Sequence, residues 1–170
     1  MFNQALILKP IDQPTEILGS LQSGQLLRIK GERGSALIIC HRHHAELAGP
    51  GAAVGSLFDL DCHRTIPIGK IALVYPESRP ERLKAYRIRQ EWLRFTQKGM
   101  ESHVPLQRAQ NILILLTKYF GGGTVIQLPD EIVAQLVGVL PKTIQIARRS
   151  IQLKLEDLQQ NAPQISVTNK

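Results

Sequence analysis

Residues 128–152 read LPDEIVAQLVGVLPKTIQIARRSIQ, and this stretch decides the fold of the second half of the chain. Pro129 and Asp130 are typical of a helix N-terminus, since proline fixes φ there and a carboxylate interacts favourably with the helix dipole. Gly138 supplies the left-handed residue that a tight turn after a helix requires. Pro141 is again suited to a first helical turn. The stretch therefore predicts a short helix, a turn at Gly138 and a second helix.

The second of these helices has two contrasting faces. Ile144, Ala147 and Ile151 recur at spacings of three and four residues and predict a buried back. The other face is cationic and hydrogen-bonding, and it consists of Lys142, Thr143, Gln145, Arg148 and Arg149. Such a face suits the major groove of DNA, where Lys, Arg and Gln reach base edges and Thr reaches phosphates. The pattern predicts a helix-turn-helix that binds double-stranded DNA.

The stretch from Val104 to Ile151 resembles the DNA-binding domain of the Crp/Fnr family of bacterial transcriptional regulators. QRAQNIL at 107–113 is similar to the first helix of that domain. IQLPDEIVAQLVGV at 126–139 is similar to its strand and first motif helix, and PKTI at 141–144 to the start of its recognition helix. In that family a sensory β-roll precedes a long dimerisation helix. The resemblance implies a winged helix-turn-helix and a homodimer on a pseudo-palindromic operator.

The resemblance also assigns roles to single residues. Thr143 would contact a phosphate, and the side chains facing the groove would be Lys142, Gln145, Ile146 and Arg149. Leu140 departs from the family, which usually has a capping Ser or Thr there, and Ile146 takes a position that is often Arg. Residues 161–168 offer only an abbreviated wing.

The charge distribution favours the same function. The formal net charge is +7, and residues 79–154 hold 13 Lys and Arg against 5 Asp and Glu, whereas the rest of the chain holds 8 against 9. All of the excess positive charge therefore lies in one segment. A segregated basic region is typical of nucleic-acid binders, although a basic surface kept for solubility is the alternative.

Residues 1–78 have the pattern of β-structure. Short apolar runs at 5–8, 25–29, 35–39 and 69–74 are separated by Gly- and Pro-containing turn sequences. This spacing predicts a small sandwich or barrel, and by resemblance a reduced β-roll of the cyclic-nucleotide type.

The residues present do not favour binding of a cyclic nucleotide, which is the ligand expected of such a roll. Residues 47–58 look like the strand-turn signature of the family's effector domain, and Arg64 and Thr65 stand where its phosphate-binding pair would be. Ser56, however, replaces the acidic residue that would hold the ribose. We therefore expect no cyclic nucleotide and no cofactor.

A long helix is expected over 79–99, with Ser78 as its cap and Gly99 as its end. It carries two apolar stripes, the first with Leu83, Tyr86 and Leu93 and the second with Ile88, Trp92 and Phe95. Two stripes indicate a helix covered on two sides, either by a second copy of the chain or wholly within one monomer. The residues expected at a dimer interface are Leu83, Tyr86, Trp92 and Leu93.

A further helix is expected over 105–119, followed by a glycine-rich turn and a short strand at 125–128. The turn is not a phosphate-binding loop, because no Lys-Ser or Lys-Thr pair follows it.

Both cysteines and four of the five histidines fall into two clusters, namely Cys40, His41, His43 and His44, and Cys62 with His63. These residue types ligate zinc, copper and haem iron, and two adjacent strand ends would bring the clusters together. Strand alternation separates Cys40 and His44 from His41 and His43, which favours a polar strand end without metal. Two cysteines are also too few for an iron–sulfur cluster of the Fnr type.

Together these features predict an α+β protein with three parts. These are a reduced β-roll at 1–78, a dimerisation helix at 79–99 and a winged helix-turn-helix at 100–170. The expected function is that of a cytoplasmic DNA-binding transcriptional regulator, not an enzyme, since no nucleophile and base form a recognisable set. A protein-interaction adaptor and a metal- or redox-responsive switch are the alternatives. The longest aliphatic run, at 112–116, is too short for a membrane span, and residues 1–4 do not resemble the start of a signal peptide.

Overall fold

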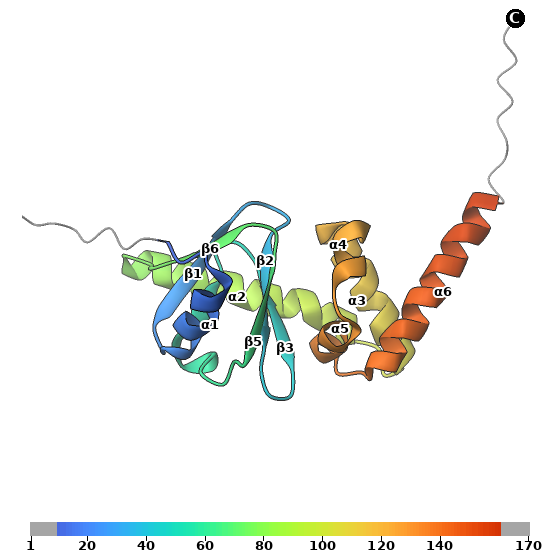
Figure 1. The fold of residues 1–170 in the computed structure, drawn as a ribbon, viewed down its shortest axis with the longest axis horizontal. Coiled ribbons are helices and arrows are strands. Elements are labelled where there is room, and N and C mark those ends of the chain that lie inside the picture. Colours follow the sequence, from blue (N-terminus) through green and yellow to red (C-terminus); the bar gives the residue numbers. More distant parts are fainter. Residues whose placement is uncertain (1–9, 161–170) are drawn as a thin grey trace, which may run out of the picture.

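The computed structural model describes residues 10–160, which form a mixed α+β fold. The strands lie in the first half of the chain and form two three-stranded antiparallel sheets with the orders β4-β1-β6 and β3-β2-β5. Figure 1 shows the sheets on one side, helices α3 to α6 on the other, and α2 running behind the sheets toward the helical half. The α+β class predicted from the sequence is confirmed.

The two sheets are built from short strands. The first contains β1 (Leu26–Gly31), β4 (Ala53–Gly55) and β6 (Ile71–Val74), and the second contains β2 (Ala36–Cys40), β3 (Ala45–Ala48) and β5 (Arg64–Ile68). A short 3₁₀ turn, η1 (Ser56–Phe58), follows β4. The apolar runs at 25–29, 35–39 and 69–74 thus correspond to β1, β2 and β6, whereas the run at 5–8 lies outside the described residues.

One segment of the first half is helical instead of extended. Helix α1 (Pro14–Gln22) carries proline and Glu16 in its first turn, as helix N-termini favour. Ile17 and Leu21 are four residues apart and fully buried, so this face packs on the sheets. The prediction of β-structure throughout 1–78 was wrong here. Ile17 and Leu21 have the four-residue spacing of a helix face, which differs from the alternation of a strand.

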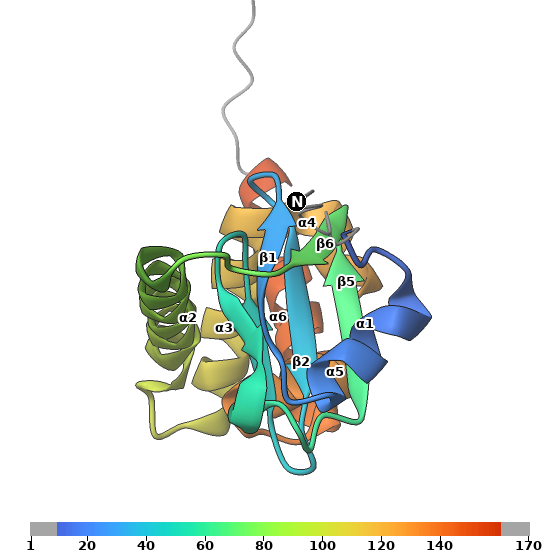
Figure 2. The same cartoon turned by 90° about the vertical axis from the view of Figure 1, so that its left-hand side faces the viewer.

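Both faces of strand β2 are covered. All five of its residues are buried, which is unusual for an antiparallel strand and requires a layer on each side. The other sheet supplies one layer, while α2 and α5 pack against the neighbouring strand β3 on the other side. Figure 2 shows the sheets in front of the helical half. One continuous apolar core therefore joins the two halves of the chain.

Helix α2 (Arg79–Met100) begins as predicted, with the Ser78 hydroxyl accepting a hydrogen bond from the backbone N–H of Glu81 at 3.3 Å. It does not end at Gly99 but continues to Met100. Gly99 lies where α2 meets α3, and a Cβ there would approach the Cβ of Ile112 to 3.4 Å. This distance is ordinary van der Waals contact, so neither packing nor helix termination requires a glycine here.

The helical half contains α3 (Pro105–Phe120), α4 (Gly122–Gln127), α5 (Asp130–Val137) and α6 (Pro141–Gln160). Residues 125–128 were predicted as a strand, but 125–127 belong to α4. No strand lies between residues 101 and 160 to pair with them, and α4 satisfies its backbone locally, with the Val125 N–H donating to Gly121 O at 3.2 Å. The expected wing at 161–168 lies outside the described residues. Within 10–160, no helix combines the length and the apolar character needed to cross a membrane.

Candidate nucleic-acid interface

A tight turn joins α5 to α6. Gly138 adopts the left-handed conformation (φ 62°, ψ 48°), and its N–H donates to Ala134 O. Val139 N–H donates to the same carbonyl at 3.1 Å, so the last turn of α5 is closed by backbone contacts. Because Ala134 is buried and small, the following helix can approach α5 closely. The helix–turn–helix connectivity expected around Gly138 is present.

The back of α6 is anchored in the core. Ile144 and Ala147 are fully buried, and α6 packs against both α3 and α5. The Gln110 amide of α3 also donates to the Ser150 hydroxyl at 3.1 Å. The orientation of α6 about its own axis is therefore fixed by packing on two neighbours.

Arg148 faces inward. Its Nε donates to Asp130 Oδ1 at 2.8 Å, its Nη1 to Val125 O at 3.0 Å and its Nη2 to Leu128 O at 2.9 Å. All three nitrogens of the guanidinium are therefore engaged, and they join α6 to the end of α4 and the start of α5. The sequence placed Arg148 on the cationic front, but in the structure it is a positioning residue of the helical half.

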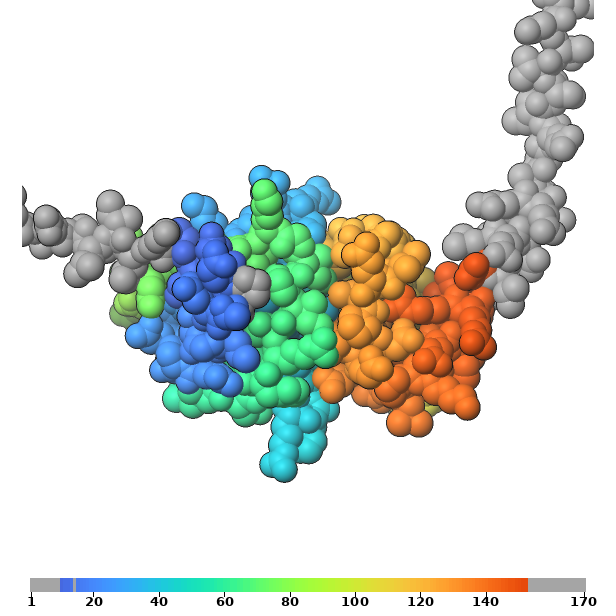
Figure 3. All heavy atoms as spheres, in the orientation of Figure 1, coloured from blue at the N-terminus to red at the C-terminus, as the bar shows by residue number. Residues whose placement is uncertain are grey.

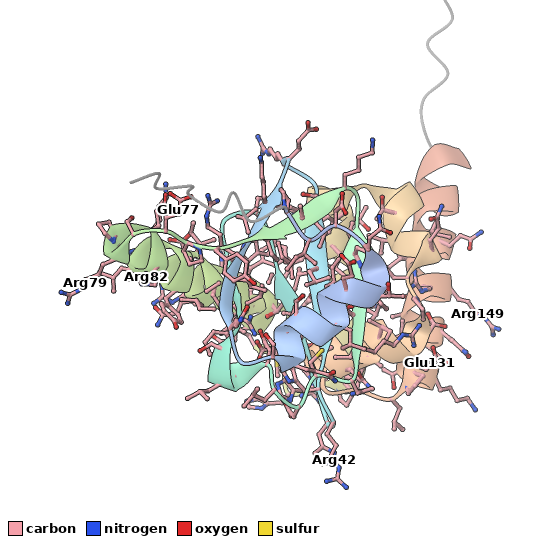
Figure 4. All side chains as sticks on the ribbon, turned by 60° about the vertical axis from the view of Figure 1, so that its left-hand side comes forward. Arg42, Glu77, Arg79, Arg82, Glu131 and Arg149 are labelled. Carbon is pink, nitrogen blue, oxygen red and sulfur yellow. The ribbon has the colours of Figure 1, made fainter. Side chains whose placement is uncertain are left out.

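The outer face of α6 carries the remaining polar residues. Lys142, Gln145, Ile146 and Arg149 are exposed and follow one another at spacings of three, one and three residues, which places them on one stripe of the helix. Thr143 is half-buried beside the turn. Arg149 points away from the body of the molecule (Figure 4). Among the side chains that the structure describes, which end at residue 152, no carboxylate lies within ion-pair distance of Lys142 or Arg149.

The four residues expected at a dimer interface separate into two environments. Leu83 is 57% exposed and Tyr86 37% exposed, and Leu93 is half-buried. Trp92 instead lies in the core, where its ring contacts Tyr119 edge-on at 4.9 Å between centroids and covers Gly49 so closely that a Cβ there would overlap the indole. The stripe with Ile88, Trp92 and Phe95 is therefore packed within the monomer, and the stripe with Leu83 faces solvent.

A buried ion-pair cluster that the sequence did not predict holds α2 on the sheets. Arg89 donates to the Asp59 carboxylate at 3.0 and 3.2 Å, to Ala53 O at 3.0 Å and to the Glu46 carboxylate. Burial alone would lower the pKa of Arg89, but the contacts with Asp59 and Glu46 raise it. The helical spacing could have indicated that Arg89 is buried, because it lies four residues after Ala85 and three before Trp92 on the inner face of α2.

The two cysteine–histidine clusters are only partly brought together. Cys40 and Cys62 are buried free thiols, and burial raises the pKa of both, that of Cys62 to about 11. Thiols held in the protonated form are poor nucleophiles and poor metal ligands, which disfavours a switch that uses them. His43 and His63 are exposed, whereas His41 is buried and stacks on His44.

The residues of the cyclic-nucleotide signature are dispersed on the sheet half. Arg64 is exposed on β5, and Ser56 stands in η1 at a φ of 56°. The space between the sheets is filled by fully buried side chains, including Leu27, Ile29, Leu37 and Leu73. A hollow of about 500 Å³ lies outside the sheets, against Trp92, Phe95 and Tyr119. Comparisons of this chain with protein-family models, with curated proteins and with solved structures give no match.

Proposed function

We propose that this protein is a DNA-binding transcriptional regulator of the Crp/Fnr type, in which α5 and α6 form a helix-turn-helix and α6 is the recognition helix. The observation that carries the proposal is the exposed stripe of Lys142, Gln145, Ile146 and Arg149 on α6. It has no ion pair with any described side chain, and the back of the helix is fixed in the core. A rigid helix that presents cationic and amide side chains is the form that enters a major groove.

The stripe offers distinct contacts to distinct bases. Arg149 and Lys142 suit the acceptor pair of guanine, and Gln145 suits the donor and acceptor of adenine. Ile146 offers an apolar contact to a thymine methyl group. Thr143, beside the turn, is placed to reach a phosphate and fix the helix along the groove.

The proposed assembly is a cytoplasmic homodimer. The stripe of α2 that faces solvent contains Leu83, Tyr86 and the half-buried Leu93. It would form the dimer seam, since two helices pair along apolar residues that recur every three or four positions. The sheets would correspond to a reduced β-roll and residues 161–168 to an abbreviated wing. Two recognition helices would then read half-sites about 34 Å apart.

Selection of bound duplexes from a random library tests this function. We expect enrichment of an inverted repeat with half-site centres about ten base pairs apart, and no enrichment for a Lys142→Ala/Gln145→Ala/Arg149→Ala variant that retains its fold by circular dichroism. Failure of the wild-type protein to enrich any duplex would contradict the proposal.

A protein-interaction adaptor is the second candidate, and one observation favours it. Leu140 is 72% exposed and Ile126 77% exposed, so the helical half also presents apolar side chains to solvent. Exposed apolar side chains serve a protein partner where they form a contiguous patch, which is what this candidate function requires of Leu140 and Ile126. An adaptor would give no enriched duplex in the selection above, which separates the two functions.

A further inference from the structure

The end of the β2–β3 hairpin gathers three side chains that have no part in the proposed DNA contact. His41, His44 and Glu46 each offer a ligand atom, and these atoms lie within 4.8 Å of one another. The two imidazole rings stack with their centroids 4.6 Å apart. The hairpin projects from the body of the molecule (Figure 3), and Arg42 marks its tip (Figure 4).

His41 is the unusual member of this group. It is 2% exposed, its Nδ1 lies 2.7 Å from Asp61 Oδ1, and its Nε2 is buried without a hydrogen-bond partner. A buried polar atom without a partner is costly and calls for an unseen water or ion. When Nδ1 carries the proton and donates it to the Asp61 carboxylate, Nε2 is left with a free lone pair, which is the tautomer that a histidine ligand requires.

The surrounding charge also favours a cation. Asp59, Asp61 and Glu46 contribute three carboxylates around His41, and the ion pairs of the cluster include a single guanidinium, that of Arg89. The nearest approach between Asp59 and His41 is 3.5 Å, from Oδ1 to Nε2. A divalent ion at Nε2 of His41 would balance this excess of negative charge.

We propose that His41, His44 and Glu46 bind a divalent transition-metal ion of the zinc class, with Asp61 orienting His41. Two imidazoles and a carboxylate are a known zinc ligand set with an open fourth position, whereas magnesium and calcium require oxygen ligands. The ion replaces the contact of 3.2 Å between His44 Nε2 and Glu46 Oε1. Ligands about 2.0–2.2 Å from zinc lie no more than about 4 Å apart. The His41 and His44 rings are stacked within 12°, so the exposed His44 must turn out of the stack for both nitrogens to point at one ion.

Titration of the full chain with zinc alone tests the proposal. After the protein is stripped with a chelator, we expect one ion per chain in a competition assay with a chromophoric chelator. His44→Gln should weaken binding at least about 10-fold, and Asp61→Asn about 10- to 100-fold as an orienting partner. His44 and Asp61 are 55% and 63% exposed, so both variants leave the core intact.

His43→Gln and His63→Gln are matched controls, because both histidines are exposed in the same region and lie outside the site. They should bind zinc as the wild type does. Cobalt in place of zinc should give visible absorption bands typical of four-coordinate nitrogen and oxygen ligation, and His44→Gln should remove them. Absence of stoichiometric binding, equal loss in the controls, or no effect of His44→Gln would overturn the metal site without bearing on DNA binding.

Discussion

The carboxylate of Asp130 and the guanidinium of Arg148 join the first turn of α5 to the middle of α6, with Oδ1 and Nε 2.8 Å apart. The next residue along the chain, Arg149, is exposed and unpaired among the described residues. Two adjacent arginines therefore have opposite orientations. Arg148 fixes α6 to its neighbours, and Arg149 is presented to solvent.

This division predicts different effects on stability. Arg148→Ala should lower the free energy of unfolding by about 1–3 kcal/mol, because the Asp130 carboxylate and the Leu128 carbonyl lose a donor. The Val125 carbonyl also loses one donor and keeps the Leu128 N–H. Arg149→Ala should change the free energy of unfolding by less than about 0.5 kcal/mol, as is usual for surface substitutions. Urea denaturation followed by circular dichroism measures both. Equal effects of the two substitutions would show that Arg148 does not hold the helices together.

If α6 is the recognition helix, Arg149 should contact a base and Thr143 a phosphate. Arg149→Ala should cost about 1–3 kcal/mol at its own base position and relax the preference there. Thr143→Val should weaken binding to specific and non-specific duplexes alike, because a phosphate contact carries no sequence information. Competition binding to the selected duplex and to scrambled duplex separates these effects. A preferred sequence left intact by Arg149→Ala would show that the helix docks in another register.

The buried cluster on α2 should make stability depend on pH. Burial alone would raise the pKa of Glu46, but the charge and hydrogen bond of Arg89 lower it below its ordinary value of 4.5. A depressed carboxyl pKa stabilises the fold fully above the unfolded value and loses this contribution as pH falls through the folded value.

Arg89→Met leaves the fully buried Asp59 and the half-buried Glu46 without their cationic partner, so it should cost about 3–5 kcal/mol at pH 7. The difference from wild type should shrink as the pH falls below about 4.5, where protonation of Glu46 removes the unpaired charge. Urea unfolding at several pH values measures this difference, and a gap that stays constant or widens would contradict the assignment.

The proposed dimer seam is tested on its most exposed residue. Leu83→Asp should shift the protein toward monomer in light scattering and weaken operator binding together, because a carboxylate would be buried without a partner in the seam. Leu57→Asp is the control, since Leu57 is 82% exposed but lies off α2. A Leu83→Asp variant that remains dimeric would place the seam elsewhere.

The helical half was largely predictable because its pattern is local. Gly138, Pro141 and the spacing of Ile144 and Ala147 specify the turn and the buried side of α6, and the structure has both. Helix α4 was not predictable in the same way, since Val125 and Ile126 favour a strand by propensity and only the absence of a neighbouring strand within 101–160 selects the helix.

The candidate site shows the limit of such patterns. Arg148 and Arg149 both fit the cationic face by sequence, but the carbonyls that bind Arg148 belong to Val125 and Leu128, about twenty residues earlier. Trp92 similarly fits a dimer stripe by sequence, but in the structure its ring packs over Gly49 and against Tyr119. Contacts between distant segments decide these roles, and a single sequence does not display them.

Binding to duplex DNA as a function of salt tests the central claim most directly. Fluorescence anisotropy should show affinity falling steeply, with a dimer that makes about six to ten phosphate contacts losing about 10³-fold or more between about 50 and 200 mM salt. Lys142→Ala/Arg149→Ala should bind the selected duplex more weakly at every salt concentration, because two base contacts are lost. The steep dependence on salt should persist, because it comes from contacts to the phosphates. Binding that does not respond to salt, or no binding at low salt, would contradict the assignment of α6 as a DNA-recognition helix.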